Sequence, residues 1–444
     1  MKLKVNEIRN AEIIDSTLLR IIFQFTASHH LYFLNHYNFV TFNIDKNYHI
    51  YMKKIKDSSR RKFLQQGIAM GIFSPLANNI LVGTDQISQK EILQNESSAV
   101  HPLKILVLGG TGFLGPQQIA YALNRGHEIT TFNRGRTKPT TQIDIFNEIE
   151  QLTGDRENDL ESLNGRKWDL VIDNSGNREK WVKDTVDLLK KNVELYLYTS
   201  STGVYYPYLG KDIKENTKPV LKVPEGITPV QKMEYDYGVM KAKNELTVIN
   251  GFGDDRSIIV RPTYMMGPGD NTDRFTYWPE RLSRGGEILV PAKKDDPVQY
   301  IDVRDVASFM IRLAEKKKTG IYNAVGPISP TGMHAFIYGA YAAFSSPVSF
   351  VMIDDHNFLK THNILEQVPW IMPVGDNAGS AFINNMLSIF NGLTFTPLAD
   401  SVRDIYEWWH SEAVTEERRK KLIDSENSLM KKEVEVINEW KKRK

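Results

Sequence analysis

The sequence predicts an α/β fold in which a doubly wound parallel sheet precedes a smaller C-terminal lobe. Near-continuous apolar runs alternate with helical patterns from Leu103 onward, and a glycine-rich loop joins the first run to the first helix. After about residue 263, Pro-rich loops and short helices replace this alternation. Strands that are apolar throughout and separated by helices indicate a parallel sheet covered on both faces.

Local patterns place the individual elements. A buried strand begins at Leu103, and the helix PQQIAYALNRG that follows it ends at Gly126. Further strands are expected at HEITTFN, KWDLVIDNSG, VELYLYTSS and DDRSIIVRP, a helix at WVKDTVDLLKKN and a turn at LTGD. The tail from Thr415 is predicted to be one charged helix that docks through Leu422, Leu429, Val434, Ile437 and Trp440.

The composition excludes several kinds of chemistry. The 444 residues include no cysteine, which excludes disulfides, thiolate zinc sites, iron–sulfur clusters and thiol nucleophiles. The net charge of +2 provides no basic surface that demands nucleic acid or an anionic membrane. No apolar run reaches the ~18 residues of a membrane span, and no metal site is expected.

The first hundred residues carry a basic segment. Residues 1–51 follow neither a strand nor a helix period, and Met52 precedes KKIKDSSRRKFL, so we expect an over-extended N-terminus and a true start at Met52. A genuine N-terminal segment is the alternative. Ser59-Arg60-Arg61-Lys62-Phe63-Leu64-Gln65 resembles the twin-arginine translocation signal, which implies contact with the export machinery and a periplasmic or otherwise extracytoplasmic location. Ser97 and Ala99 are small residues suited to cleavage; a linker in a cytoplasmic protein is the alternative.

The glycine-rich loop is typical of a dinucleotide site. Glycine there permits a tight turn, close approach of the backbone to a pyrophosphate and close helix–strand packing. The helix N-terminus adds free N–H groups and the positive end of its dipole. A glycine-rich turn without a ligand is the alternative. We expect a Rossmann fold that binds NAD or NADP through Gly109, Thr111, Gly112, Phe113, Leu114 and Gly115.

Strand ends bear on the choice of cofactor. The second strand ends at Asn133, followed by Arg134 and Arg136, without the carboxylate that would bind the ribose of NAD. Guanidinium groups can grip a 2′-phosphate, so the pattern favours NADP over NAD. Asp155 is expected to accept from the adenine amino group, and Asn174 and Ser175 to line the nicotinamide side.

One strand end and one helix supply candidate catalytic residues. YTSSTGVYY offers hydroxyl groups, and MEYDYGVMKAKNE places Tyr237 and Lys241 on one helix face. A tyrosine with its usual pKa near ~10 is a poor base, so we expect the Lys241 ammonium and an oxidised nicotinamide to lower the pKa of Tyr237. Ser201 would hold the substrate oxygen and share its proton.

These residues resemble the extended short-chain dehydrogenase/reductase superfamily, specifically the NAD-dependent epimerase/dehydratase family, over about residues 103–330. The glycine loop, Ser-Ser-x-x-Val-Tyr, Tyr-Gly-x-x-Lys, Arg261-Pro262 and the motif from Tyr300 to Ala307 occur in family order. The resemblance implies a Rossmann fold with a C-terminal substrate-binding lobe. It also implies Ser201, selected over Ser200 by its spacing from Val204, with Tyr237 and Lys241 as the triad. Tyr237, Lys241 and Pro262 would be among the cofactor contacts.

One position departs from the family. Sugar-nucleotide epimerases carry an arginine for the substrate diphosphate where this chain has Val298. A nucleotide-sugar substrate is therefore disfavoured unless Lys293, Lys294 or Arg274 substitutes. Tyr205, Tyr206 and Tyr208 would suit stacking on a sugar ring, although they could equally pack the lobe.

The chain divides accordingly. The expected parts are 1–51, a signal and linker over 52–99, an NAD(P)-binding Rossmann domain over 100–262, a substrate lobe over 263–412 with returning Rossmann elements near 298–327, and a charged helix over 413–444. An exported enzyme has no replenished cofactor pool, so we expect redox-neutral removal and return of a hydride on a hydroxylated, sugar-like substrate, with a retained cofactor. The alternatives are an NADP(H)-dependent reductase or dehydrogenase with exchangeable cofactor, and a non-catalytic Rossmann-fold protein that binds RNA. By analogy with the family, a homodimer is a further expectation.

Overall fold

The computed structural model describes residues 30–35, 38–44, 50–54, 101–426 and 428–443. These residues fall into two units. The first unit holds a three-stranded antiparallel sheet of β1 (His30–Asn35), β2 (Asn38–Ile44) and β3 (Ile50–Lys54). Met52 therefore lies in β3, whereas Arg60, Arg61, Ser97 and Ala99 lie outside the described residues.

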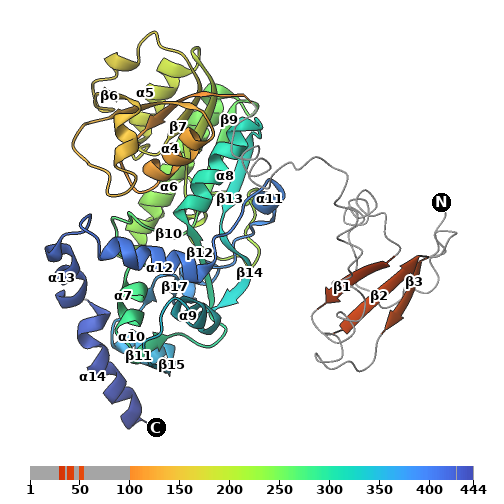
Figure 1. Ribbon diagram of the computed structural model, residues 1–444, viewed down its shortest axis with the longest axis vertical. Coiled ribbons are helices and arrows are strands. Elements are labelled where there is room, and N and C mark those ends of the chain that lie inside the picture. Colours follow the sequence, from red (N-terminus) through yellow and green to blue (C-terminus); the bar gives the residue numbers. More distant parts are fainter. Residues whose placement is uncertain (1–29, 36–37, 45–49, 55–100, 427, 444) are drawn as a thin grey trace, which may run out of the picture. The chain divides into compact units, whose positions relative to one another are not determined.

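A seven-stranded parallel sheet forms the centre of the second unit. Its order is β6-β5-β4-β7-β8-β9-β13 (Figure 1). The chain runs outward from β4 in one direction and then in the other, so the predicted Rossmann-type, doubly wound α/β fold is confirmed. The strands are β4 (Lys104–Leu108), β5 (Glu128–Asn133), β6 (Glu150–Thr153), β7 (Trp168–Asp173), β8 (Val193–Thr199), β9 (Ser257–Pro262) and β13 (Gly320–Ala324). The segment LTGD, expected to be a turn, begins inside β6.

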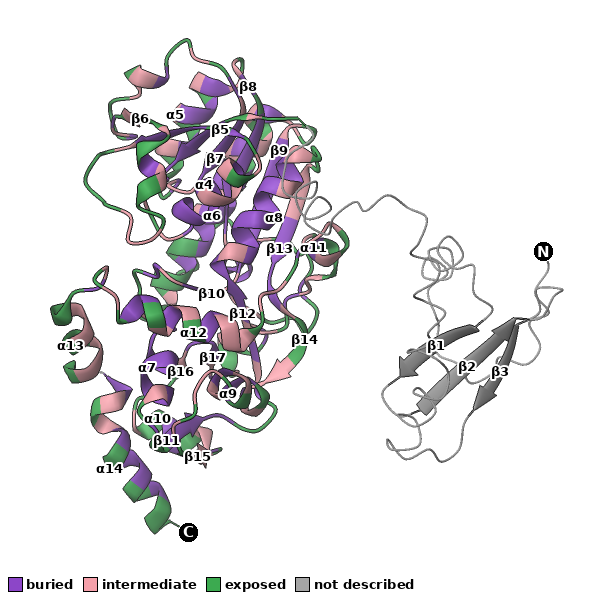
Figure 2. Ribbon diagram, viewed as in Figure 1, coloured by how far each residue is buried: buried purple, intermediate pink, exposed green. Residues whose placement is uncertain are grey.

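Helices cover both faces of this sheet because its strands are apolar on both sides. Along β4, Ile105 and Val107 belong to one hydrophobic cluster and Leu106 and Leu108 to another. Figure 2 shows the strands between the helices as buried. The first cluster includes residues of α4 (Gly115–Asn124) and α8 (Val303–Glu315), which pack together, and the second includes residues of the packed pair α5 (Glu179–Leu189) and α6 (Pro229–Phe252).

The C-terminal lobe has a separate core around the fully buried Trp278 and Trp370. Within this part of the chain, α8 and β13 return to the Rossmann sheet. The remaining strands are β10 (Met265–Met266), β11 (Gly286–Pro291), β12 (Pro297–Asp302), β14 (Gly326–Gly332), β15 (Val348–Ile353), β16 (Glu366–Gln367) and β17 (Trp370–Ile371). The helices are α7 (Tyr277–Ser283), α9 (Met333–Tyr341), α10 (His356–Thr361), α11 (Met386–Phe390) and α12 (Leu398–Trp409), and the 3-10 helices of the second unit are η2 (Asp144–Asn147), η3 (Glu161–Leu163), η4 (Thr202–Tyr205) and η5 (Gly375–Asn377).

The charged tail forms two helices, so the prediction of a single one is wrong. These are α13 (Glu416–Asp424) and α14 (Leu429–Lys442). Between them the Ser428 hydroxyl donates to the carbonyl of Leu422 at 2.7 Å, a local bond of the kind that competes with helical pairing. Val434, expected on the docked face, is 68 % exposed. None of the helices in the described residues is both long and apolar enough to cross a membrane.

Candidate active site

The glycine-rich loop follows β4 and opens α4. Gly109 has φ +81, and a side chain there would come within 2.7 Å of the Ser175 side chain. A side chain on Gly115 would collide with the backbone of Gly110. The Gly110 N–H donates to Asn133 Oδ1 at 3.0 Å, which ties the loop to the end of β5. Glycine is therefore required here by close approach, as a dinucleotide loop needs.

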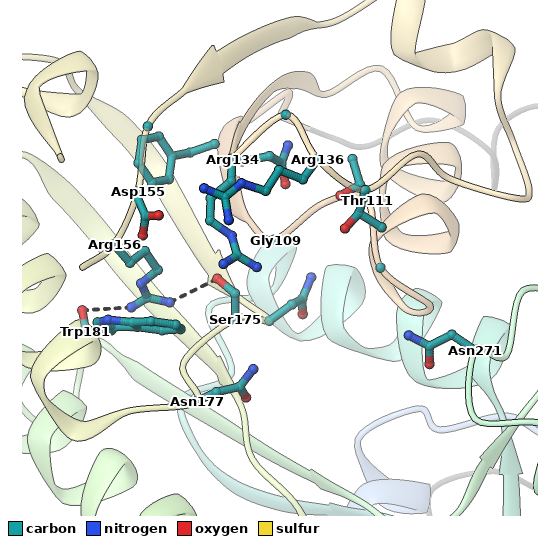
Figure 3. A pocket seen from close by; sticks show the side chains of 17 residues that line it. Gly109, Thr111, Arg134, Arg136, Asp155, Arg156, Ser175, Asn177, Trp181 and Asn271 are labelled. Atoms are coloured by element: carbon teal, nitrogen blue, oxygen red, sulfur yellow. Dashed lines mark hydrogen bonds between the residues drawn. The ribbon is translucent and has the colours of Figure 1, made fainter. Parts of the chain in front are cut away.

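A cavity of about 350 Å³ lies against this loop at the switch point between β4 and β7 (Figure 3). Open α/β sheets bind ligands at this place, beyond the carboxyl ends of the strands. Figure 3 shows Asp155, Arg156 and Trp181 together on one side and Asn271 on the other. Nine residues predicted to contact the cofactor line the cavity: Gly109, Thr111, Gly112, Asn133, Arg134, Arg136, Asp155, Asn174 and Ser175.

Other predicted cofactor residues do not line this cavity. The side chain of Leu114 is buried in the core beneath the loop, and Pro262 is buried in β9. Phe113 also packs against that core, and Gly115 serves helix–loop packing. Their contribution is to shape the loop and the sheet rather than to line the cavity.

Arg156 forms the cavity wall, and the sequence reasoning missed it. Its guanidinium donates to both oxygens of Asp173 at 2.5 and 2.9 Å and to Ser175 Oγ at 3.1 Å. Arg156 is 5 % exposed and Asp173 fully buried. Tyr196 donates a further hydrogen bond to Asp173 at 2.7 Å. This pair fixes the end of β7, and with it the two residues that follow in the cavity.

The two serines at the end of β8 point to different partners. Ser200 Oγ donates to Glu245 at 2.5 Å, and Glu245 is held by the buried Arg261. Ser201 caps η4 by accepting from the Gly203 N–H at 3.0 Å. A Cβ on Gly203 would lie 3.3 Å from Ser201 Oγ and 3.0 Å from the Tyr237 ring, so Ser201 is the serine that lies beside the tyrosine.

Helix α6 brings Tyr237 against η4 through a glycine contact. A side chain on Gly238 would collide with the Gly203 carbonyl, so the next residue in α6 must be small. The ring of Tyr237 lies on Gly203, where a Cβ would be 3.0 Å from two ring carbons. Tyr237 is nevertheless 43 % exposed, which leaves it open to a reacting molecule.

Lys241 connects the tyrosine helix to the cavity. Its ammonium donates to the Thr199 carbonyl at 3.0 Å, and the Thr199 hydroxyl donates to Asn174 Oδ1 at 2.7 Å. Asn174 lines the cavity. Desolvation lowers the pKa of Lys241 to about 8, against the opposing charges of Asp173 and Glu245.

The expectation that Lys241 and an oxidised nicotinamide together lower the pKa of Tyr237 stays a prediction, because it includes a bound cofactor. In the chain by itself desolvation is the largest influence and raises the pKa of Tyr237, and the neighbouring Ser201 and the charge of Arg274 only partly offset it. The ammonium of Lys241 donates to a backbone carbonyl. Tyr237 is thus a protonated group that can donate at neutral pH.

The aromatic residues after β8 mainly build the lobe. Tyr205 is buried, donates to Asn323 at 2.8 Å and receives a bond from Arg261. Tyr206 is buried, donates to Asp376 and packs edge-on against Tyr208. Val298 is 1 % exposed in the core. Its aliphatic side chain cannot bind a phosphate as an arginine at this position would.

Arg274 is a cation whose charge lowers the pKa of Tyr237. It is exposed, stacks over Tyr264 with 5.2 Å to the ring centroid, and influences the pKa of Tyr237. Among the described residues, no group of three or more His, Cys, Asp or Glu could hold a metal ion.

Comparisons with known proteins agree with this architecture. Residues 105–325, which span the seven-stranded sheet, match the model of the NAD dependent epimerase/dehydratase family. This segment therefore resembles that family and has a Rossmann-type fold. The chain is 28 % identical over 243 residues to the chloroplast stem-loop binding protein of 41 kDa b of Arabidopsis thaliana, a match that covers 52 % of this chain and spans only 60 % of that relative's length.

Two solved structures share the fold at low identity. WbmH of Bordetella bronchiseptica in complex with NAD⁺ is 16 % identical, with a TM-score of 0.50, covering 71 % of this chain and 100 % of that one. The dTDP-glucose 4,6-dehydratase of Bacillus anthracis in complex with NAD is 15 % identical, with a TM-score of 0.50, covering 70 % of this chain and 98 % of that one. These likenesses show the fold.

The buried Lys241 predicts a pH-dependent stability. Its folded pKa of about 8 lies below the ordinary ~10.4, so between these values the unfolded chain binds a proton that the folded chain does not. The free energy of unfolding should therefore rise with pH in this window relative to Lys241→Met. Urea unfolding at several pH values measures the difference, and Lys243→Met, half-buried on the same helix, should run parallel to the unmodified protein. A constant difference between the protein and Lys241→Met would contradict the assignment.

Proposed function

We propose that this chain is an NAD(P)-dependent epimerase/dehydratase-like enzyme that removes and returns a hydride on a hydroxylated, sugar-like substrate and retains its cofactor. The observation that carries the proposal is the placement of Ser201 and Tyr237 together against Gly203, with the buried Lys241 on the same helix as Tyr237 and two hydrogen bonds from a glycine-lined cavity. The family match over residues 105–325 supports it. A dinucleotide fits the cavity because Gly109 and Gly112 leave room for a pyrophosphate against the loop.

The residues of the chain then have distinct roles. A bound nicotinamide dinucleotide would supply a reversible hydride acceptor. Tyr237 exchanges a proton with the substrate hydroxyl as that carbon is oxidised and later reduced, so that no net electrons are consumed. Ser201 would bond the same oxygen, and with an oxidised nicotinamide bound, Lys241 would add positive charge that favours the phenolate. The exposed face of Tyr237 admits the substrate.

The substrate proposed here carries no nucleotide diphosphate. The position that would hold a diphosphate arginine is the buried Val298. Lys293 and Lys294 are exposed in the turn before β12, and only Arg274 among the suggested substitutes acts on Tyr237. One exposed guanidinium is a weak clamp for two phosphates, whereas Tyr264 beneath it offers a ring face for a sugar.

Tyr237→Phe should abolish turnover without loss of the fold. Loss of the proton-transfer group should lower the rate by about 10²–10⁴-fold, while dinucleotide affinity changes little. Epimer formation by NMR from a panel of free sugars and nucleotide sugars measures it, with Tyr235→Phe on the same helix as the matched control. Full turnover in Tyr237→Phe would reject the proposed role.

The cofactor is proposed to be NADP rather than NAD. Arg134 and Arg136 are exposed at the edge of the cavity, and the end of β5 offers Asn133 instead of a carboxylate. The Asn133 oxygen accepts from the Gly110 N–H, and its neutral amide carries no charge to repel a 2′-phosphate. Asp155 lines the same cavity and remains the proposed acceptor for adenine.

Arg134→Ser/Arg136→Ser should weaken NADP binding selectively. Loss of charge-assisted hydrogen bonds to a 2′-phosphate should raise the Kd for NADP by about 10-fold or more and change the Kd for NAD by less than ~3-fold. Calorimetric titration measures both. Lys138→Ser, exposed nearby but outside the cavity lining, is the control; equal losses for both cofactors would favour NAD.

Export by the twin-arginine route is proposed from the motif Ser59–Gln65 and the short apolar run that follows it in the sequence. This route moves folded proteins, so a cofactor could be loaded beforehand, which suits a redox-neutral reaction. Cell fractionation of a tagged chain should place it outside the cytoplasm, and Arg60→Lys/Arg61→Lys should retain it inside. If the tagged chain and the Arg60→Lys/Arg61→Lys variant are both found in the cytoplasm, the result would support a cytoplasmic reductase or dehydrogenase with exchangeable NADP(H).

A second candidate function is RNA binding without catalysis. The Arabidopsis relative is named for binding a stem-loop, whereas the net charge of +2 here offers no strong electrostatic attraction to phosphates. In the Tyr237→Phe experiment, unchanged biological activity together with salt-dependent binding of a stem-loop RNA would favour this function over the enzyme.

A further inference from the structure

Loop 269–274 of the C-terminal lobe borders the candidate cofactor cavity. Asn271 lines the cavity across from Arg156 (Figure 3). Gly269 packs on the other lobe, where a Cβ would lie 3.3 Å from Thr141 and 3.7 Å from Phe113 of the glycine loop. At its far end the loop carries Arg274, whose charge acts on Tyr237. One short loop therefore reaches both the cavity and the tyrosine.

The loop conformation is held partly by its own residues. Asp270 is buried and accepts from the Thr272 N–H at 2.8 Å and from its hydroxyl at 2.7 Å. Asp273 has φ +58, a left-handed backbone that few residues other than Gly, Asn and Asp adopt readily. Such a conformation persists only where surrounding contacts determine it.

Arg418 of α13 supplies those contacts. Its guanidinium donates to both carboxylate oxygens of Asp273 at 3.0 and 2.6 Å and to the Asp270 carbonyl at 2.5 Å. It lies over the rings of Trp408 and Trp409, at 5.3 and 5.7 Å from their centroids. A bidentate pair between a stacked guanidinium and a carboxylate has one favoured geometry. The loop is thus tied to α13.

We propose that Arg418 is a positioning residue that holds loop 269–274 over the bound dinucleotide and slows its release. The inference rests on the proposed function, because it presumes that the cavity binds a dinucleotide. Arg418 lies outside residues 105–325, the segment that matches the family. This contact between Arg418 and loop 269–274, called the latch below, would give this chain its own means of retaining a cofactor.

Release of NADPH from the full-length protein tests the latch. Protein loaded with NADPH is chased with excess NADP⁺, and nicotinamide fluorescence gives the dissociation rate. Arg418→Ala should release NADPH at least tenfold faster, and Arg418→Lys, which keeps the charge but loses the bidentate fork, at an intermediate rate. Asp273→Asn keeps a residue suited to positive φ and should also speed release. The double variant Arg418→Ala/Asp273→Asn should be no faster than Arg418→Ala, and Arg419→Ala should match the unmodified protein.

The outcomes separate the two proposals. The latch is overturned if Arg418→Ala releases NADPH at the rate of the unmodified protein and the melting temperature of the dinucleotide-free protein is unchanged. If Arg418→Ala does not fold, unmodified release from Asp273→Asn overturns it instead. If the unmodified protein neither retains nor binds NADP or NAD, the proposed function itself fails. Retention that is independent of both residues rejects only the latch.

Discussion

The buried ammonium of Lys241 joins the parts of the candidate site. It donates to the end of β8 at Thr199, and the Thr199 hydroxyl reaches Asn174 at the end of β7. Water is excluded around it, so its charged form is costly and tolerable only because Asp173 and Glu245 lie within electrostatic range. The positions of two strand ends, of α6 and of the cavity wall are therefore coupled through one titratable group.

Two buried ion pairs provide the negative charges that this ammonium needs. Asp173 is matched by Arg156 and Glu245 by Arg261, each with nearly complete exclusion from water. Such pairs add little net stability compared with apolar packing, but removal of one partner is costly. Their structural effect is to position the neighbouring serines. Arg156 donates to Ser175, and Ser200 donates to Glu245, so that Ser201 is the serine left beside Tyr237.

The features predicted correctly are those recorded in short stretches of sequence. The alternation of apolar strands and helices, the glycine loop, and the Tyr237–Lys241 spacing each depend on near neighbours. Arg156 was missed although it follows Asp155, because its role is created by Asp173 at the end of β7 and by Ser175 just after it. Asn271 comes from the other lobe, and no local sequence pattern predicts that it lines the cavity. In the chain by itself, desolvation raises the pKa of Tyr237, an influence that the spacing of residues does not reveal.

The division of the chain into a dinucleotide domain and a lobe is therefore incomplete as an account of the site. The cavity is built mostly from the loops that follow β4, β5, β6 and β7, yet Asn271 in its lining comes from loop 269–274, which Arg418 ties to α13. Residues 105–325 contain this loop but not Arg418, which holds it. Likeness over that segment thus informs the chemistry that Tyr237 and the glycine loop can support, whereas the hold on a cofactor depends on the C-terminal helices and has to be established from their contacts in each chain.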